Sequence, residues 1–264
     1  MKEIVKRLVA DTPLEPVAHW LYRAVTGKPP LGAPPSSTGV ALNTLYDEQT
    51  PRVIGRVVQR DSNCVDVGCH TGMVLDHLLE LAPDGHHFAF EPLPDLFEGL
   101  QAKYAGRPNV ALYRVALSDT AGRSTFHHVV SNPGYSGILQ REFDRPHEDV
   151  VKINVELARL DDIVPAGVPI RFIKIDVEGA ELQVLRGAAR VLRESRPYVL
   201  FEHGLKASDV YGTTPQAVHD FLSGFGLRIC LMSDWLEGNG RVLGREDLVD
   251  QFENRRNFYF LAHP

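Results

Sequence analysis

Acidic side chains follow several short apolar runs of this sequence, where parallel strands would present them to a ligand. The first is Asp66, which follows Asn63-Cys64-Val65 and precedes Gly68 and Gly72. Glycines after a strand let the backbone turn sharply and approach a nucleotide. A dinucleotide-binding turn has its first glycine where this chain has Asp66, and a carboxylate repels phosphate. Asp66 therefore favours a ligand with ammonium or sulfonium charge, such as S-adenosylmethionine, although it could also simply cap the turn.

Two further polar positions fit the same ligand. Glu91 follows the next apolar run, and an acid ~20 residues beyond such a turn holds ribose hydroxyls. Because Pro92 can begin a helix, Glu91 could instead be only a helix cap. Ser118-Asp119 follows a third run and could bond an adenine amine or close a turn. The expected donor-binding residues are Asp66, Gly68, His70, Gly72, Glu91, Ser118 and Asp119.

The densest acidic cluster is Lys174-Ile175-Asp176-Val177-Glu178-Gly179-Ala180-Glu181. Glu178 and Glu181 suit the first turn of a helix, where the macrodipole favours negative charge. Asp176 is better explained as a strand-end residue that faces the same crevice as Asp66. It is expected to be catalytic.

Glu202-His203 ends the following apolar run, next to Asp176 in a parallel sheet. Asp176, Glu202 and His203 could together hold Mg²⁺ or Mn²⁺, which would acidify a substrate hydroxyl. Alternatively, Glu202 or His203 could be a metal-free general base, or the two could form a purely structural acid–histidine pair.

A polar segment at 131–149 interrupts the alternation of strands and helices. Loops of this kind carry specificity, so substrate contacts are expected from its polar side chains. The residues chosen on position alone are Tyr135, Ser136, Arg141 and His147.

The elements that must position these residues follow an α/β rhythm, and strands that alternate with helices predict one mostly parallel seven-stranded sheet covered on both faces. Expected strands are 63–67, 86–91, 109–115, 170–176, 197–202, 226–232 and 257–262. Expected helices are 43–60, 72–82, 94–105, 179–194 and 214–224. Strand-like stretches at 123–130 and 150–157 flank the polar segment, and a helical lead at 1–26 is followed by a loop or lid at 27–39.

The composition fits a globular protein of 264 residues and argues against several classes. A net charge of −6 disfavours a general nucleic-acid binder. Three cysteines without a C-x-x-C pair suggest neither a disulfide framework nor a cysteine zinc site. No apolar run reaches the ~20 residues that span a bilayer, and no signal peptide is apparent, so a cytoplasmic protein is expected.

The motifs taken together resemble those of the FkbM family of S-adenosylmethionine-dependent methyltransferases. The resemblance covers about residues 46–203 and rests on the order and spacing of five pieces. These are Asp66-Val67-Gly68-x-x-x-Gly72, Phe90-Glu91-Pro92, Ala116-Leu117-Ser118-Asp119, Arg159-Leu160-Asp161-Asp162 and Lys174 to Glu181. Many relatives have small residues in place of Cys69-His70, which makes His70 a local difference.

The resemblance implies a Rossmann-like methyltransferase fold. With the pattern of strands and helices, we expect an N-terminal helical or lid segment at 1–45 and a methyltransferase domain at 46–264 with an insertion at about 120–160; the N-terminal 40 residues and the tail after 235 fall outside the resemblance. The resemblance also implies O-methylation of a carbohydrate, as in polysaccharide or glycosylated natural product synthesis; mycobacterial methylmannose polysaccharide synthesis is one candidate. The expected partners are a small-molecule or oligosaccharide substrate and a possible second copy of the chain. The alternatives are a non-sugar hydroxyl acceptor or a non-catalytic regulatory module that binds the same donor. An NAD-dependent oxidoreductase is disfavoured by Asp66.

Overall fold

The computed structural model describes residues 37–143, 147–238 and 240–264. Residues 46–264 form one compact unit. The helical lead expected at 1–26 and most of the loop expected at 27–39 lie outside the described residues, so the domain boundary near residue 45 stays a prediction.

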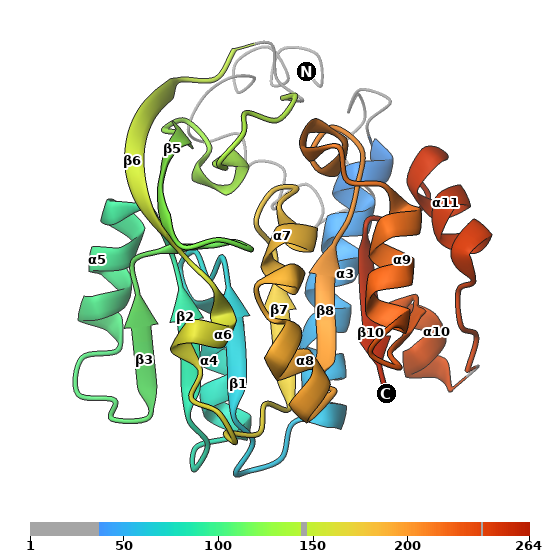
Figure 1. Ribbon diagram of the computed structural model, residues 1–264, viewed down its shortest axis with the longest axis horizontal. Helices are drawn as coiled ribbons and strands as arrows, with labels where there is room; N and C mark the ends of the chain where they lie inside the picture. The colour runs from blue at the N-terminus through green and yellow to red at the C-terminus, as the bar shows by residue number, and fades with distance from the viewer. Residues whose placement is uncertain (1–36, 144–146, 239) are drawn as a thin grey trace, which may run out of the picture. The chain divides into compact units, whose positions relative to one another are not determined.

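A seven-stranded sheet forms the centre of this unit, in the order β3-β2-β1-β7-β8-β10-β9 (Figure 1). Five neighbouring strands are parallel, while β10 runs antiparallel between β8 and β9. The expected mostly parallel seven-stranded sheet is therefore confirmed. Its strands are β1 (Cys64–Val67), β2 (His87–Phe90), β3 (Val110–Tyr113), β7 (Phe172–Ile175), β8 (Tyr198–Glu202), β9 (Arg228–Cys230) and β10 (Tyr259–His263).

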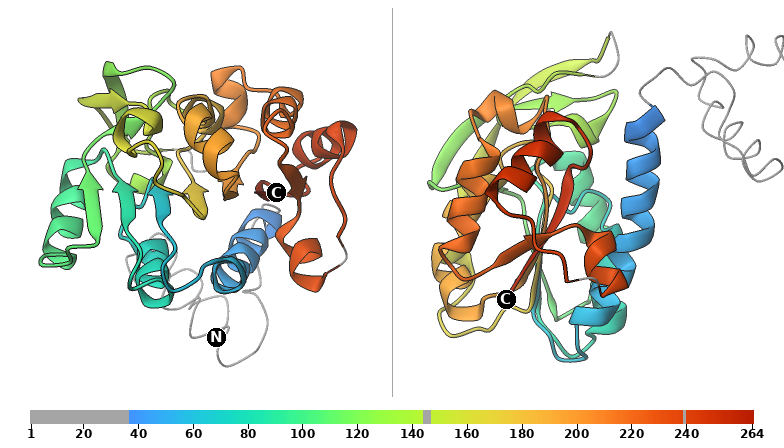
Figure 2. Two further views of the ribbon diagram at one scale, coloured as in Figure 1. Left: turned by 60° about the horizontal axis from the view of Figure 1, so that its bottom comes forward. Right: turned by 90° about the vertical axis from the view of Figure 1, so that its right-hand side faces the viewer.

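Helices cover both faces of the sheet, as the two views of Figure 2 show. They are α3 (Ser37–Val57), α4 (Met73–Leu81), α5 (Pro94–Lys103), α6 (Leu160–Ile163), α7 (Glu181–Arg186), α8 (Ala189–Ser195), α9 (Pro215–Ser223), α10 (Met232–Glu237) and α11 (Arg245–Glu253). Val65 and Val67 point into the larger core with α6 to α9 and α11, whereas the intervening Asp66 points to the opposite face. Because helices cover both faces of the sheet, this alternation buries the Asp66 carboxylate.

One expected helix, 179–194, is divided into α7 and α8. The break is at Gly187, where an added Cβ would lie 2.0 Å from the carbonyl oxygen of Ser118. The amide of Asp161 donates to the Gly187 carbonyl oxygen at 3.0 Å. The prediction of one continuous helix was wrong because the close approach of another chain segment at Gly187 is not encoded in the helical periodicity.

A second sheet of three strands, in the order β4-β6-β5, is built from β4 (Ala116–Leu117), β5 (Gly122–Val129) and β6 (Val150–Ala158). Phe126 and Val155 on one side pack with Leu93 and Ala116. Between β5 and β6 the chain makes a 3-10 turn, η1 (Pro133–Tyr135), and pairs back at His127 and Gly137. We call residues 130–143 and 147–149 the insertion loop.

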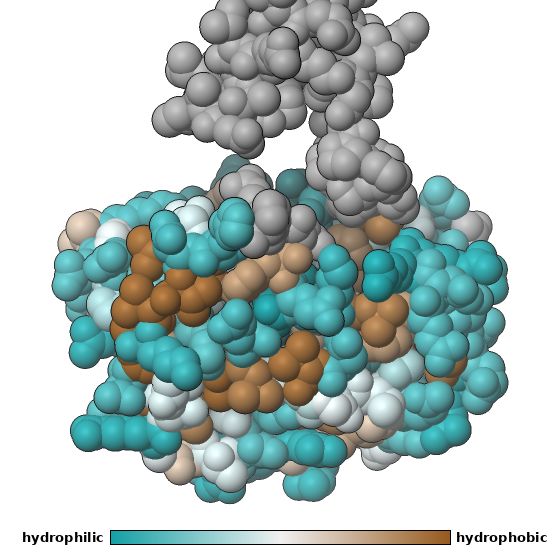
Figure 3. Space-filling view, turned by 90° about the horizontal axis from the view of Figure 1, so that it is seen from above, coloured by the Kyte–Doolittle hydropathy of each residue, from teal (hydrophilic) through white to brown (hydrophobic). Residues whose placement is uncertain are grey.

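The end of the molecule with the insertion loop is seen from above in Figure 3. Hydrophilic surface predominates there, with separate hydrophobic patches. Three exposed apolar side chains belong to the insertion loop or its flanking strand: Val130, Leu139 and Val151. None of the described helices is long and apolar enough to cross a membrane.

Candidate active site

The glycine turn after β1 is held tightly against the chain that follows β7. Gly68 has φ +70°, and an added Cβ would lie 1.9 Å from the carbonyl oxygen of Asp176. Gly72 has φ +80°, and its carbonyl oxygen accepts from the Tyr104 hydroxyl at 2.8 Å. Only glycine fits the first position, because a side chain would force the turn away from Asp176. The turn and the acidic cluster are therefore one structural feature.

Glu91 closes the same turn from the side of β2. Its carboxylate is 5% exposed and accepts from the amides of His70, at 2.9 Å, and Leu93, at 3.0 Å. His70 has a left-handed backbone with φ 49°. Burial raises the pKa of Glu91, against the two amide hydrogen bonds. Each carboxylate oxygen has a second lone pair, so a role toward ribose hydroxyls stays a prediction.

Lys174 lies beneath the turn as a buried cation. Its ammonium group is 2.8 Å from the carbonyl oxygen of Gly68, 3.8 Å from the Asp66 carboxylate and 3.5 Å from the Asp176 carboxylate. Lys174 and Asp66 are direct cross-strand partners in β7 and β1. Their side chains therefore emerge on the same face of the sheet, and Lys174 links the turn to the acid after β7.

Asp176, Glu178 and Glu202 bring their carboxylate oxygens within 4.8 Å of one another. We call these three side chains the carboxylate cluster. Asp176 follows β7 and Glu202 ends β8, so the parallel pairing predicted from the sequence brings these two together. Tyr259 of β10 donates its hydroxyl to Asp176 at 2.8 Å.

Arg141 of the insertion loop covers one side of the carboxylate cluster. Its guanidinium forms an ion pair with Glu178, and both side chains are nearly buried, at 10% and 13% exposed. The guanidinium also stacks over the Tyr135 ring, 4.4 Å from its centroid. Tyr135 and Arg141, two of the expected substrate-contact residues, therefore lie together. The part of the insertion loop that carries them packs beside the carboxylate cluster.

Burial and mutual repulsion shift the acids of this region. Burial raises the pKa of Asp66 to about 6, partly offset by Lys174. Burial also raises the pKa of Glu178 to about 8, against the attraction of Arg141, and raises that of Glu202 well above its ordinary range. Asp176 is the exception: despite its burial, Lys174 and hydrogen bonds from Tyr259 and Glu202 lower its pKa. The pKa values of the neighbours Asp176 and Glu202 are therefore shifted in opposite directions.

His203 does not join the carboxylate cluster. Its ring is fully buried and stacks on Phe252 of α11, with 4.6 Å between the ring centroids. Burial lowers its pKa to about 4. Glu202 and His203 are consecutive at the end of an extended strand, so their side chains leave on opposite faces. The expectation that His203 shares a metal or base site with Asp176 and Glu202 is corrected accordingly.

The remaining predicted residues lie in separate places. Ser118 is buried, with its hydroxyl 3.3 Å from an Asp119 carboxylate oxygen. Ser136 is also buried, and its hydroxyl accepts from the amide of Val129 at 3.0 Å, so it stabilises the insertion loop itself. His147 is exposed. The donor roles of Ser118 and Asp119 and a substrate role of His147 stay predictions.

Three residues of the site were not recognised as such from the sequence: Lys174, Glu178 and Tyr259. Glu178 was assigned to a helical first turn, but α7 begins at Glu181 and Glu178 has φ 58°. Lys174 could have been found from its spacing, because it is two residues before Asp176 on the same strand face. Nothing in the sequence pattern places Tyr259 next to Asp176.

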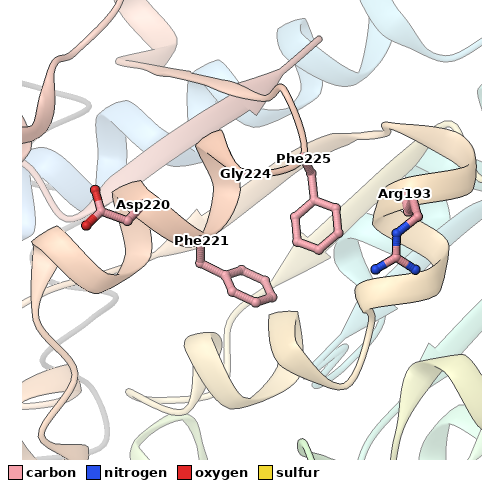
Figure 4. Close-up of a pocket in the computed structure, with 5 residues that line it drawn as sticks. All are labelled: Arg193, Asp220, Phe221, Gly224 and Phe225. Carbon is pink, nitrogen blue, oxygen red and sulfur yellow. The ribbon is translucent and has the colours of Figure 1, made fainter.

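A separate pocket of about 480 Å³ lies between α8 and α9. Figure 4 shows Phe221 and Phe225 between Asp220 and Arg193 in this pocket. Asp220 is already paired with Arg245 at 3.2 Å, and Arg193 lies over the Phe225 ring. None of the sequence-predicted site residues lines it.

A mostly parallel seven-stranded sheet with an antiparallel strand inserted near its edge, and acids at the carboxyl ends of its strands, defines a Rossmann-like methyltransferase. The family model of the Methyltransferase FkbM domain matches residues 66–229, which is more than half of the chain. The chain therefore belongs to the FkbM methyltransferase family.

Known methyltransferases share part of this sequence. The chain is 30% identical over 152 residues to methyltransferase sdnD of Sordaria araneosa, covering 47% of this chain and 59% of that protein. It is 29% identical over 196 residues to 2-O-methyltransferase NoeI of Sinorhizobium fredii, covering 67% and 77%. Hexuronic acid methyltransferase AglP of Haloferax volcanii is 27% identical over 177 residues, covering 62% and 66%.

Proposed function

We propose that this methyltransferase transfers a methyl group from S-adenosylmethionine to a hydroxyl of a carbohydrate. Family membership supports methyl transfer, and two of the relatives support an oxygen or sugar acceptor by name: a 2-O-methyltransferase and a hexuronic acid methyltransferase. An acceptor screen identifies which sugar is methylated, and the sugars tested include those of mycobacterial methylmannose polysaccharide synthesis.

The excess of buried acid at the site is the observation that carries the proposal. Six carboxyl groups lie in this region with two cations, Lys174 and Arg141; the six are Asp66, Glu91, Asp176, Glu178, Glu181 and Glu202. Both oxygens of Asp66 lack a hydrogen-bond partner among the described residues. A donor with ammonium and sulfonium groups would supply the missing positive charge. The residues present therefore fit S-adenosylmethionine better than a phosphate-bearing cofactor.

The proposed reaction is an in-line displacement in which the acceptor oxygen takes the methyl group as the carbon–sulfur bond breaks. The chain must hold the two reactants in line and remove the hydroxyl proton. We assign proton removal to the Asp176–Glu202 pair. The two carboxyl groups titrate as a pair, and the carboxylate that is ionised can take the proton of the acceptor hydroxyl. Tyr259 and Lys174 hold Asp176 in place.

A divalent metal at the same carboxyl groups is the competing form of this proposal, since a carboxylate that binds a metal is not free to act as the base. Three carboxylates within 4.8 Å are the hard oxygen donors that Mg²⁺ or Mn²⁺ prefers. Glu178 is already paired with Arg141, so Asp176 and Glu202 would be its main protein ligands. Turnover in EDTA, followed by addition of Mg²⁺, tests this point. Unchanged turnover in EDTA would contradict a metal requirement.

Replacement of Glu202 by Gln tests the proton step. The E202Q variant should lose about 100-fold to 10,000-fold in kcat, because general acid–base contributions have this size. Its dissociation constant for S-adenosylmethionine, measured calorimetrically, should stay unchanged. Glu194→Gln is the matched control, since Glu194 is exposed and ion-paired on α8. An E202Q enzyme with full turnover would reject the assignment.

The acceptor screen separates the proposal from its alternatives. Transfer of labelled methyl groups to mono- and oligosaccharides, and not to phenols or hydroxy acids, is expected. Transfer only to non-sugar hydroxyls would change the acceptor class. Donor binding without transfer to any acceptor would favour a non-catalytic module.

A further inference from the structure

Tyr46 of α3 packs against the start of β10, although the two are far apart in the sequence. Its hydroxyl donates to the side-chain oxygen of Asn257 at 3.1 Å and accepts from the amide of Phe258 at 3.2 Å. Its ring lies edge-on to the Phe258 ring, with 5.0 Å between the centroids, and 5.4 Å from the Tyr259 ring at an angle of 34°. Tyr46 is 6% exposed, so one buried side chain contacts three consecutive residues.

Tyr259 is the residue of this group that reaches the carboxylate cluster. It is the direct cross-strand partner of Glu202 in the antiparallel pair of β8 and β10, so the two side chains emerge on the same face of the sheet. From this position its hydroxyl donates to Asp176 at 2.8 Å. A continuous series of contacts therefore runs from Tyr46 through Tyr259 to Asp176.

The start of β10 is paired with another strand on one side only. Pairing with β8 runs from Tyr259 to Ala262, whereas pairing with β9 begins at Leu261. Within the described residues, Tyr259 itself therefore has no partner in β9. Chain segments with few neighbours open more readily than the centre of a sheet. A side chain that must hold a reacting group in place needs neighbours that fix its conformation, and Tyr46 is such a neighbour.

We infer that Tyr46 is a positioning residue for methyl transfer, because it holds the start of β10 so that the Tyr259 hydroxyl stays on Asp176. This inference rests on the proposed function, in which Asp176 takes part in removal of the acceptor proton. Tyr46 acts through Tyr259, since its own hydrogen bonds go to Asn257 and Phe258 and not to the carboxylate cluster.

The exchange rate of the Tyr259 hydroxyl proton tests this geometry without any methyl transfer. Proton NMR of the full chain measures the rate, and the resonance is assigned by its loss in Y259F. The Y46F variant loses the two hydroxyl contacts but keeps the ring, so exchange should become about fivefold faster, the size expected for a net hydrogen bond. Y46L also loses the ring contact and should exchange faster still.

The matched control is Y198L. Tyr198 begins β8, and its ring stacks on His263 of β10, so it contacts the same pair of strands at their other end. Y198L should leave both the exchange of the Tyr259 hydroxyl and kcat unchanged. Equally fast exchange in Y198L would indicate general loosening of β10 and would overturn the inference, as would wild-type exchange in the two Tyr46 variants.

Turnover in a double-mutant cycle tests the consequence for methyl transfer. Y46L should lower kcat by up to about tenfold, as expected for loss of an aromatic pair, with the Kd for S-adenosylmethionine unchanged. The Y46L/Y259F variant should be no slower than Y259F, because Tyr46 acts through Tyr259. Losses that multiply in the double variant would reject this route.

The two measurements separate this inference from the proposed function. A wild-type protein that transfers no methyl group would refute the proposed function and leave the exchange result standing. Normal methyl transfer together with unchanged exchange in Y46F and Y46L would refute this inference alone.

Discussion

Lys174 connects the two parts of the site, which are the glycine turn after β1 and the carboxylate cluster. It contacts the glycine turn through Gly68 and lies close to the carboxylates of Asp66 and Asp176 while only 7% exposed. A buried cation with acids on both sides stabilises them against their mutual repulsion. The turn that is assigned to the donor and the acid that is assigned to the acceptor therefore share one counter-charge.

Substitution of Lys174 by Met should destabilise the protein by about 3–5 kcal/mol, since loss of one partner leaves a buried charge uncompensated. Urea unfolding at neutral pH measures the change. The K174M/D66N double variant should recover part of it, because the unpaired carboxylate is then neutral. A single K174M variant as stable as the wild type would show that Asp66 and Asp176 do not need this cation.

Glu181 should give the stability a pH dependence. Its side chain is 1% exposed, and burial raises its pKa from 4.5 to about 7. Between these values the folded state holds the proton more tightly than the unfolded chain, so stability falls as pH rises through this window. The loss is about 3 kcal/mol at most, at 1.36 kcal/mol for each pKa unit.

The E181Q variant is the test of this effect. Glutamine cannot ionise, yet its amide oxygen can still accept from the amides of Val177 and Gly179, as Glu181 does. The difference in unfolding free energy between wild type and E181Q should therefore change between pH 5 and pH 7. A constant difference across that range would contradict the raised pKa.

Sequence reasoning found the residues that end strands, but not their partners. Asp66, Asp176 and Glu202 follow apolar runs, and the rule that parallel strands present their carboxyl ends together was enough to group them. Lys174 faces Asp66 only because β1 and β7 pair in one particular register, which depends on tertiary packing. His203 was misplaced because adjacency in sequence was taken for adjacency in space.

Among the elements, the insertion loop is held to the rest of the protein by few contacts. The Leu139 amide donates to the Tyr211 hydroxyl at 2.9 Å, and the Glu142 amide donates to the carbonyl oxygen of Lys206 at 3.0 Å. Together with the Arg141–Glu178 ion pair, these contacts fix the loop beside the carboxylate cluster. The alternation of residues in β5 and β6 was visible in the sequence, whereas the docking of the loop between them was not.

The Y211F variant should loosen the insertion loop without unfolding the protein. Loss of this hydrogen bond should raise the rate of hydrogen exchange at the Leu139 amide by up to about tenfold, for a net bond energy near 1 kcal/mol. Tyr198→Phe is the matched control, since the Tyr198 hydroxyl has no hydrogen-bond partner among the described residues. Equal exchange in the wild type and in Y211F would show that the loop is held without Tyr211.

At the scale of the whole molecule, the reactivity of the three cysteine thiols measures global unfolding. Cys64, Cys69 and Cys230 are all free and buried, at 0%, 4% and 2% exposed. Burial raises the pKa of Cys64 and Cys230 to about 12, so the thiolate is scarce as well as hidden. All three should react with a thiol reagent such as DTNB only on unfolding, with rates that rise with urea. One fast thiol in the native protein would reveal local opening, which is expected first at Cys69 in the glycine turn.

The position of β10 has a consequence for how the protein is made. Residues 259–263 lie between β8 and β9 and pair with both, and Tyr259 reaches Asp176 from there. During synthesis, β8 has an open edge, and β9 lacks its neighbour in this sheet, until residues 259–263 leave the ribosome. A nascent chain that already contains the glycine turn and all three acids of the carboxylate cluster therefore still lacks the Tyr259 hydroxyl that binds Asp176. Its unpaired β8 edge is also open to pairing with a chaperone or with another nascent copy.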